Sequence, residues 1–190
     1  MNDRRSASVY AVLLSVSCAA LLLLPFVTTF DDLLTTLAIR LGLDRSLGLI
    51  PPIEARMAVA ALRMVGIPAM AHTSQVLFQS SAYSQPLAIS WNCAGWQSLV
   101  LLGLSLATGL RGTHPVLSRF QVVAFGLGGT VLVNVARIAL VCLLAETMGY
   151  VPAVLFHDYG GTFLTMGWLF GFWAIAYRWI LVPATFRSTP

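Results

Sequence analysis

The chain has 190 residues, of which 58% are hydrophobic and only 9% are charged. Because about a quarter of the residues in an ordinary soluble domain are charged, this composition indicates an integral membrane protein. The net charge of +4 comes from eleven arginines and no lysine against seven acids. No basic cluster that would bind the phosphates of a nucleic acid is present.

Apolar runs of membrane-spanning length recur along the chain. Val9–Val27 follows Arg4 and Arg5 and predicts an N-terminal anchor. Three further predicted spans are Cys93–Leu110, Phe120–Ala145 and Gly160–Tyr177. With a cytoplasmic N-terminus, most arginines beside these spans lie on the cytoplasmic side, as the positive-inside rule expects. The sequence therefore predicts an all-α integral membrane protein of the cell membrane with about four transmembrane helices.

The segments between the spans are predicted to lie on the outer side. Residues 31–71 place charges at helical spacing between apolar residues, which predicts interfacial helices or short re-entrant segments. Within His72–Asn92, "QVLFQ" and "PLAISW" flank "SSAYSQ", with Pro86 at a strand start, and predict a short outer hairpin. Because no internal repeat or low-complexity linker occurs, we expect a single membrane domain, 1–190, with an anchor and interfacial segment at 1–50 and a core at 51–182.

The three cysteines, Cys18, Cys93 and Cys142, are widely spaced along the chain. This spacing argues against a disulfide framework, a zinc site or a dithiol redox centre. We therefore expect no metal and no cofactor. Cys18 and Cys142 lie inside apolar runs, which raise the pKa of a thiol, so both are predicted to be structural. Cys93 remains as a candidate nucleophile.

Three chemically distinct residues are predicted to meet in the outer leaflet. Cys93 opens the second span at its outer end. Arg137 lies in the third span, nine residues before Glu146, or roughly 13 Å along a helix from the outer loop. An arginine at such depth costs at least about 2.5 kcal/mol and normally has a functional role. His157 lies in the outer loop before the fourth span.

The polar residues of the third span share one helix face. Thr130, Asn134 and Arg137 are spaced i, i+4 and i+7, which predicts a polar groove facing the protein interior.

The chemistry of the three residues is coherent. A helix N-terminus and nearby cations lower the pKa of a thiol and favour the nucleophilic thiolate. Imidazole titrates near neutrality, so His157 is suited to donate and accept protons. A guanidinium is suited to stabilise a developing oxyanion. Cys93, His157 and Arg137 together therefore indicate acyl transfer through a thioester.

Three sequence blocks carry a resemblance to a known family. "NCAGWQSL" at Asn92–Leu99 fits C-[SA]-G, "NVARIALV" at Asn134–Val141 fits N-V-x-R, and "FHDYGG" at Phe156–Gly161 fits H-D-x-x-G. In this order and spacing, from about Pro51 to Leu181, the chain resembles the exosortase and archaeosortase family of membrane cysteine transpeptidases.

The resemblance implies roles for these residues and a class of substrate. Cys93 would be the nucleophile, His157 the acid/base and Arg137 the electrostatic stabiliser. The substrates would be secreted proteins with a C-terminal motif, a transmembrane helix and a basic tail, joined after cleavage to a lipid or glycan acceptor, a peptide or water. Residues predicted to support the site are Asn92, Gly95, Asn134 and Asp158, the last either orienting His157 or capping the fourth span.

Two other functions fit parts of the sequence. A non-catalytic transport or assembly subunit would use Arg137 to bind an anion. A thiol oxidoreductase is disfavoured because no second cysteine lies close to Cys93 in the sequence.

Overall fold

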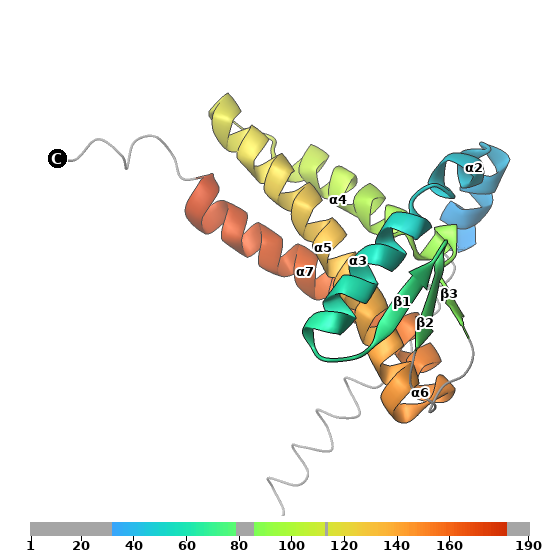
Figure 1. The fold of residues 1–190 in the computed structure, drawn as a ribbon. Helices are drawn as coiled ribbons and strands as arrows, with labels where there is room; N and C mark the ends of the chain where they lie inside the picture. The colour runs from blue at the N-terminus through green and yellow to red at the C-terminus, as the bar shows by residue number, and fades with distance from the viewer. Residues whose placement is uncertain (1–31, 79–85, 113, 182–190) are drawn as a thin grey trace, which may run out of the picture. The chain divides into compact units, whose positions relative to one another are not determined.

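A computed structural model describes residues 32–78, 86–112 and 114–181 (Figure 1). The first predicted span, Val9–Val27, and Cys18 lie outside the described residues. The chain forms two compact units, residues 1–44 and residues 45–190. In the first unit, residues 32–40 are helical, as the spacing of their charges predicted. The short helix α2, Leu43–Leu47, crosses the boundary between the units.

The second unit begins with an amphipathic helix, α3 (Pro51–Met64). Two prolines lie in its first turn. Backbone N–H groups in a first turn have no partner within the helix, so the N–H that proline lacks is not needed there. Its buried face carries small apolar side chains and one acid, Glu54. This helix was predicted, but its apolar face packs on the protein itself, against β1 and α5.

A three-stranded antiparallel sheet follows α3, in the order β1-β2-β3. Strands β2 (Gln75–Phe78) and β3 (Leu87–Ala88) pair with Val76 opposite Leu87, which confirms the predicted hairpin with Pro86 just before its second strand. Strand β1 (Ala69–His72) was not predicted, and it replaces the end of the expected interfacial helices. A two-residue turn joins β1 to β2, with His72 opposite Gln75.

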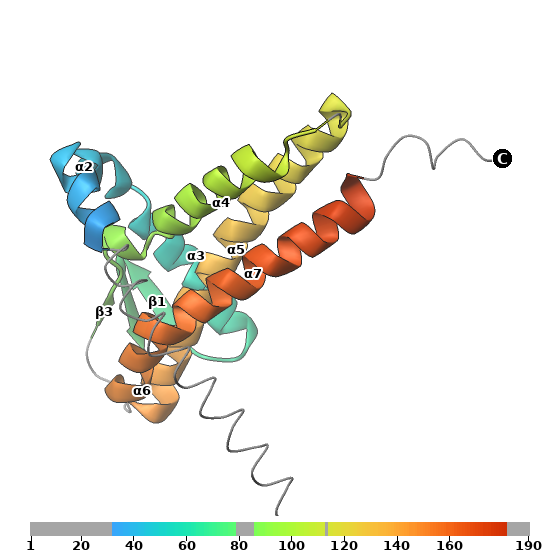
Figure 2. The same cartoon turned by 180° about the vertical axis from the view of Figure 1, so that it is seen from behind.

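Three helices, α4 (Trp96–Gly109), α5 (Val116–Met148) and α7 (Gly161–Ile175), run side by side (Figures 1 and 2). Close helix packing between apolar surfaces relies on small residues. A side chain at Gly126 would lie 3.1 Å from both Leu102 and Phe172, and one at Gly129 would overlap Trp168. The glycines of "GWLFG", at Gly167 and Gly171, have open space beside them instead.

Helix α5 is the longest element and joins the two apolar cores of the unit. Its N-terminal half packs on a cluster made by α4, α5, α7 and the residues after α7: Leu102, Val122, Phe172, Ala176 and Leu181. Its C-terminal half packs on a second cluster with α3 and the sheet, which includes Ala58, Leu62, Val76, Ile138 and Cys142. Because 33 residues of helix are about 50 Å long, α5 extends well beyond a bilayer core of about 30 Å.

Among the described residues, α5 is the one helix that is both long and apolar enough to cross a membrane by itself. It contains the whole predicted span Phe120–Ala145. Helix α4 has 14 residues and is shorter than the span predicted for it, whereas the predicted span Gly160–Tyr177 lies within a continuous helical stretch formed by α7 and the helical turns on either side of it. The fold is mostly helical, as expected, while the total of four spans stays a prediction.

The chain from Tyr150 to Ile180 is helical throughout. Helix α6 (Tyr150–Leu155) continues through a π-helical turn, η2 (Phe156–Gly160), into α7, and a second π-helical turn, η3 (Ala176–Ile180), follows. The sequence prediction of an outer loop at His157 and Asp158 was therefore wrong. Gly149, with φ +91°, ends α5 and allows the chain to turn back into α6.

Candidate active site

Cys93 lies in a short turn before α4. The 3-10 turn η1 spans Trp91–Cys93, and α4 begins at Trp96. Between them, Gly95 adopts the left-handed conformation, with φ +66° and ψ 11°. The prediction of one helix from Cys93 to Leu110 was therefore wrong, because Gly95 reverses the sign of φ before the helix starts. Cys93 lies three residues before α4, so its activation depends on side chains more than on the helix end.

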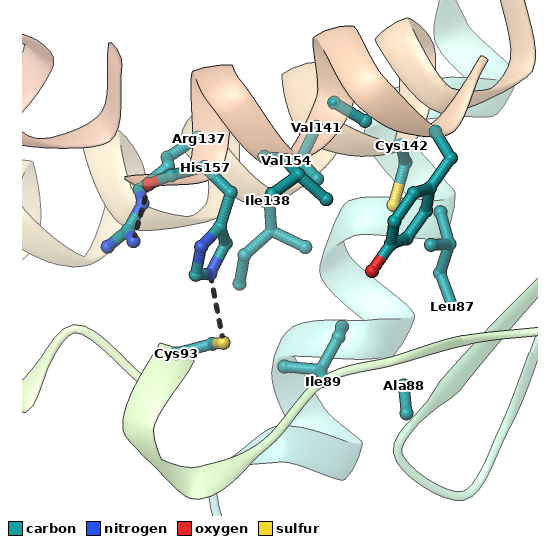
Figure 3. Close-up of a pocket in the computed structure, with 12 residues that line it drawn as sticks. Leu87, Ala88, Ile89, Cys93, Arg137, Ile138, Val141, Cys142, Val154 and His157 are labelled. Carbon is teal, nitrogen blue, oxygen red and sulfur yellow. Dashed lines mark hydrogen bonds between the residues drawn. The ribbon is translucent and has the colours of Figure 1, made fainter. Parts of the chain in front are cut away.

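The Cys93 thiol and the His157 imidazole form a hydrogen-bonded pair. Cys93 Sγ lies 3.3 Å from His157 Nε2 (Figure 3). On the other side of the ring, His157 Nδ1 lies 3.0 Å from Asp158 Oδ1. The carboxylate accepts a hydrogen bond from Nδ1–H, which leaves Nε2 to face the sulfur. The sequence left two roles open for Asp158, orienting His157 or capping the fourth span. In the structure, the Asp158 carboxylate contacts His157.

The surroundings of Cys93 favour the thiolate. Burial raises the pKa of the thiol, but hydrogen bonds with His157 and Ser90 and the positive charge of His157 outweigh burial and lower this pKa to about 7. Ser90 Oγ lies 3.3 Å from Cys93 Sγ. The hydrogen bond with Cys93 raises the pKa of His157, and the Asp158 carboxylate acts in the same direction against burial. The lowered pKa of the Cys93 thiol and the raised pKa of the His157 imidazole both shift the balance toward a thiolate–imidazolium pair.

Arg137 approaches the same turn from α5. Its Nη2 donates a hydrogen bond to the backbone carbonyl of His157 at 3.3 Å. Gly161, at the start of α7, leaves the space for this approach, since a side chain there would overlap the guanidinium. This gives a physical reason for a glycine at the end of the "HDYGG" block. Arg137 is half-buried, and Thr130 and Asn134 on its helix face are buried, as the spacing predicted.

Asn134 connects α5 to the backbone of Cys93. Its Nδ2 donates to the Cys93 carbonyl at 3.0 Å and to Glu54 Oε1 at 2.9 Å. The two N–H bonds of one amide group thus join α3, α5 and the nucleophile turn. Gly95 lies against the same side chain: a Cβ at this position would be 2.6 Å from Asn134 Cγ. Asn92 accepts a hydrogen bond from Gln97 Nε2 at 2.8 Å, which holds η1 to the first turn of α4.

A cavity of about 300 Å³ adjoins the Cys93–His157 pair (Figure 3). Its walls come from β3 and the residue after it, from α5, and from α6 and η2. Cys93, Arg137 and His157 lie at one end of the cavity, whereas Cys142 lies at the other. The sequence expectation that these three residues converge is therefore met in the fold. The His157 side chain is 39% exposed, so the pair is accessible.

Comparison with protein families identifies the chain. The model of the family described as Transmembrane exosortase (Exosortase_EpsH) matches residues 6–174, which is most of the chain. The chain belongs to the transmembrane exosortase family. It is therefore a membrane protein. Comparisons with curated proteins and with solved structures found no match. The exosortase match reaches further toward the N-terminus than the resemblance from about Pro51 onward that the sequence blocks indicated.

Sequence reasoning missed two residues of the candidate site of this exosortase. Ser90 contacts the Cys93 thiol, and it stands three residues before it in the sequence. Glu54 is 5% exposed and holds Asn134. A signal for Glu54 existed, because α3 places it on the same face as Ala55, Ala58 and Leu62. An acid on an apolar helix face indicates a buried polar contact.

The buried position of Glu54 disfavours the charged form of its carboxyl group. Burial raises the pKa of its carboxyl group, against the hydrogen bond from Asn134 and the charge of Arg137, which lower this pKa. Its Oε2 is buried and has no hydrogen-bond partner among the residues that the structure describes. Burying a carboxyl group costs free energy unless it is hydrogen-bonded, and here Glu54 Oε1 accepts a hydrogen bond that fixes the Asn134 amide.

The glycine before α4 offers a controlled test of this exosortase turn. Gly95→Ala should lower the free energy of unfolding by about 1–2 kcal/mol for the left-handed backbone alone, and the new Cβ should add to that loss by displacing Asn134. Thermal unfolding of the full chain in detergent measures the effect. Gly103→Ala is the matched control, because Gly103 lies within α4 and has open space around it. Equal unfolding temperatures for the two variants would contradict this account of Gly95.

Proposed function

We propose that this chain cleaves a C-terminal sorting signal of secreted proteins through a thioester at Cys93 and transfers the acyl group to an acceptor amine or to water. Membership of the exosortase family implies sorting-signal processing. The observation that carries the mechanism is the 3.3 Å contact between Cys93 Sγ and His157 Nε2. Cys93 is the proposed nucleophile, His157 the acid/base and Arg137 the electrostatic stabiliser.

In the first step, the Cys93 thiolate attacks the carbonyl carbon of the scissile peptide bond. A C–S bond forms, and the carbonyl electrons move to oxygen. When the tetrahedral intermediate collapses, the C–N bond breaks and the protonated His157 gives its proton to the leaving nitrogen. The products are a thioester at Cys93, a neutral imidazole and the released C-terminal segment of the signal.

The second step reverses the proton flow. Neutral His157 takes a proton from the incoming amine or water, whose nitrogen or oxygen bonds to the thioester carbon. The C–S bond then breaks and the thiolate of Cys93 is regenerated beside the imidazolium. Asp158 supports both steps by holding Nδ1 of His157, so that Nε2 keeps facing the sulfur.

Arg137 is proposed to act in two ways. Its hydrogen bond to the His157 carbonyl holds η2 against α5. Its fixed positive charge lines the same cavity as Cys93, where it favours the negative charge that develops on the carbonyl oxygen. Both effects depend on Gly161, which gives the guanidinium room.

The proposed position of the site along the membrane normal is compatible with a sorting signal that contains a transmembrane helix. The charge-free run of α5 from Phe120 to Ala136 is about 26 Å long, which is close to the hydrocarbon thickness. Arg137 follows directly. We therefore propose that the hydrocarbon core ends near Arg137, earlier than the predicted span Phe120–Ala145 implied, and that the Cys93–His157 pair lies near this boundary. We propose that this boundary is the outer one, where secreted substrates arrive, and that Cys93 meets the peptide bond just before the signal's own membrane helix.

The proposal is tested by trapping the acyl enzyme. Full-length protein isolated from its own membranes and quenched in acid should carry an adduct of amino-acid residues on Cys93, seen by intact mass and located by peptide mapping. Hydroxylamine, an amine nucleophile, should remove the adduct, and Cys93→Ser should not show the same hydroxylamine-labile thioester. An adduct consisting of a fatty acyl group, or a peptide adduct on Cys142 instead, would contradict the proposed mechanism.

A further inference from the structure

The cavity beside Cys93 changes character along its length. At the end nearest the nucleophile it is bordered by Arg137 and His157. Away from them the walls are mostly aliphatic, with Leu87 and Ile89 from the β3 region, Val141 from α5 and Val154 from α6. Three separate elements thus turn apolar side chains toward one space that opens on the reacting sulfur.

The cavity is large enough for a side chain. A closed apolar cavity of about 150 Å³ can bind benzene, and this cavity measures about 300 Å³. Ligand pockets in proteins commonly start at about this volume, and are mainly apolar with a few polar groups that fix orientation. The aliphatic part of the cavity, away from Arg137 and His157, excludes a charged side chain, because a charge there would lose its hydration without gaining an ionic partner.

The position of the cavity next to Cys93 determines which part of a substrate can enter it. The carbonyl carbon must come within bonding distance of Cys93 Sγ, and the side chain of the residue that carries this carbonyl is only one carbon further away. Resting on the proposed function, we infer that the cavity binds the side chain of the residue that supplies the scissile carbonyl, and that it selects an apolar side chain there. Residues of β3, α5 and α6 would then determine part of the specificity for the sorting signal.

Acetylated amino-acid chloromethyl ketones test the inference without knowledge of the natural signal. The Cys93 thiolate displaces chloride from these reagents, so a C–S bond forms, a C–Cl bond breaks and the amino-acid side chain lies beside the carbonyl. We expect full-length protein in detergent to react at Cys93 at least about tenfold faster with the Leu and Phe reagents than with the Gly reagent, since apolar pockets discriminate by such factors. The Lys reagent, whose charge has the same sign as that of Arg137, should react no faster than the Gly reagent. Each rate is divided by that of iodoacetamide.

Variants of the cavity wall locate the preference. Val141→Phe and Val154→Phe each fill the cavity from a different helix, and each should remove most of the tenfold preference, measured as the ratio to the iodoacetamide rate of the same variant. Leu140→Phe is the matched control, because Leu140 is the neighbour on α5 whose side chain is 38% exposed and outside the cavity. Val141→Ala should instead shift the preference toward the Phe reagent, which keeps the test decisive if a Phe variant does not fold.

The outcomes separate this inference from the proposed function. If Cys93 reacts with iodoacetamide at neutral pH but shows no preference for Leu or Phe, the pocket assignment is wrong and the nucleophile remains. The assignment also fails if both Phe variants keep the preference for the Leu and Phe reagents. If Cys93 does not react with iodoacetamide at all, the proposed function fails first.

Discussion

Cells that make the Cys93→Ala variant should accumulate uncleaved precursor of the secreted substrates, with no detectable mature product. Without the thiol, no atom at this position can carry the acyl group, and the Ser90 hydroxyl lies 3.3 Å from where the sulfur stood. Removal of a catalytic nucleophile typically costs several orders of magnitude in rate. Immunoblotting for the C-terminal signal in membranes and in the surface fraction measures this loss.

The control for this variant is Cys142→Ala, which removes the thiol at the far end of the same cavity. Cys142 is buried in the cluster between α5, α3 and the sheet, so its substitution should lower stability and alter the far end of the cavity, but precursor should still be cleaved because Cys93 and His157 remain. Normal processing by Cys93→Ala together with loss of function in Arg137→Ala would instead support a non-catalytic subunit that binds an anion. That pair of results would contradict the enzyme mechanism.

His157→Gln should reduce processing by about 10²–10⁴-fold, the range expected for loss of a general acid/base. Glutamine is similar in size and can hydrogen-bond the thiol, but it cannot accept or donate a proton at neutral pH. The rate of precursor conversion after a pulse of synthesis measures the loss, with His72→Gln as the control because His72 is exposed in β1. Asp158→Asn should have a smaller effect, because Asp158 is 53% exposed and acts on the proton only through His157.

A rate for His157→Gln close to that of the unsubstituted chain would show that the imidazole is not the proton carrier. Ser90 would then be the remaining polar group in contact with the sulfur.

The convergence of the three candidate residues could be predicted from the sequence, while their depth in the membrane stays a prediction. The lengths of apolar runs placed Cys93, Arg137 and His157 at one level, and they do converge around one cavity. The i, i+4, i+7 spacing of Thr130, Asn134 and Arg137 correctly predicted a buried polar face. Helical periodicity is a local property of the sequence, so these inferences needed no knowledge of tertiary contacts.

The local backbone could not be predicted in the same way. Apolar content alone does not distinguish a helix from a 3-10 turn, so the break at Gly95 was missed. The polar "FHDYGG" reads as a loop, whereas η2 keeps these residues helical because α6 and α7 both pack on α5. Strand β1 was missed because "AMAH" has no clear alternation, and its pairing with β2 depends on a turn at Thr73.

The contacts of Glu54 needed the tertiary structure. Its position on the apolar face of α3 was readable from the sequence, but its partner Asn134 lies eighty residues away. Neither the sequence blocks nor the composition connects these two positions. The same holds for the cavity, whose walls come from three segments that meet only in the fold.

The pH dependence of Cys93 alkylation by iodoacetamide tests the Cys93–His157 pair most directly. The rate follows the thiolate fraction, so in the unsubstituted chain it should rise with pH around a midpoint of about 7. In His157→Gln, burial still raises the thiol pKa while the imidazolium charge is lost, so the midpoint should move to about 8.5 or above. Peptide mapping separates Cys93 from Cys18 and Cys142. A midpoint of 8.5 or above in the unsubstituted chain, or the same midpoint in both proteins, would contradict the account.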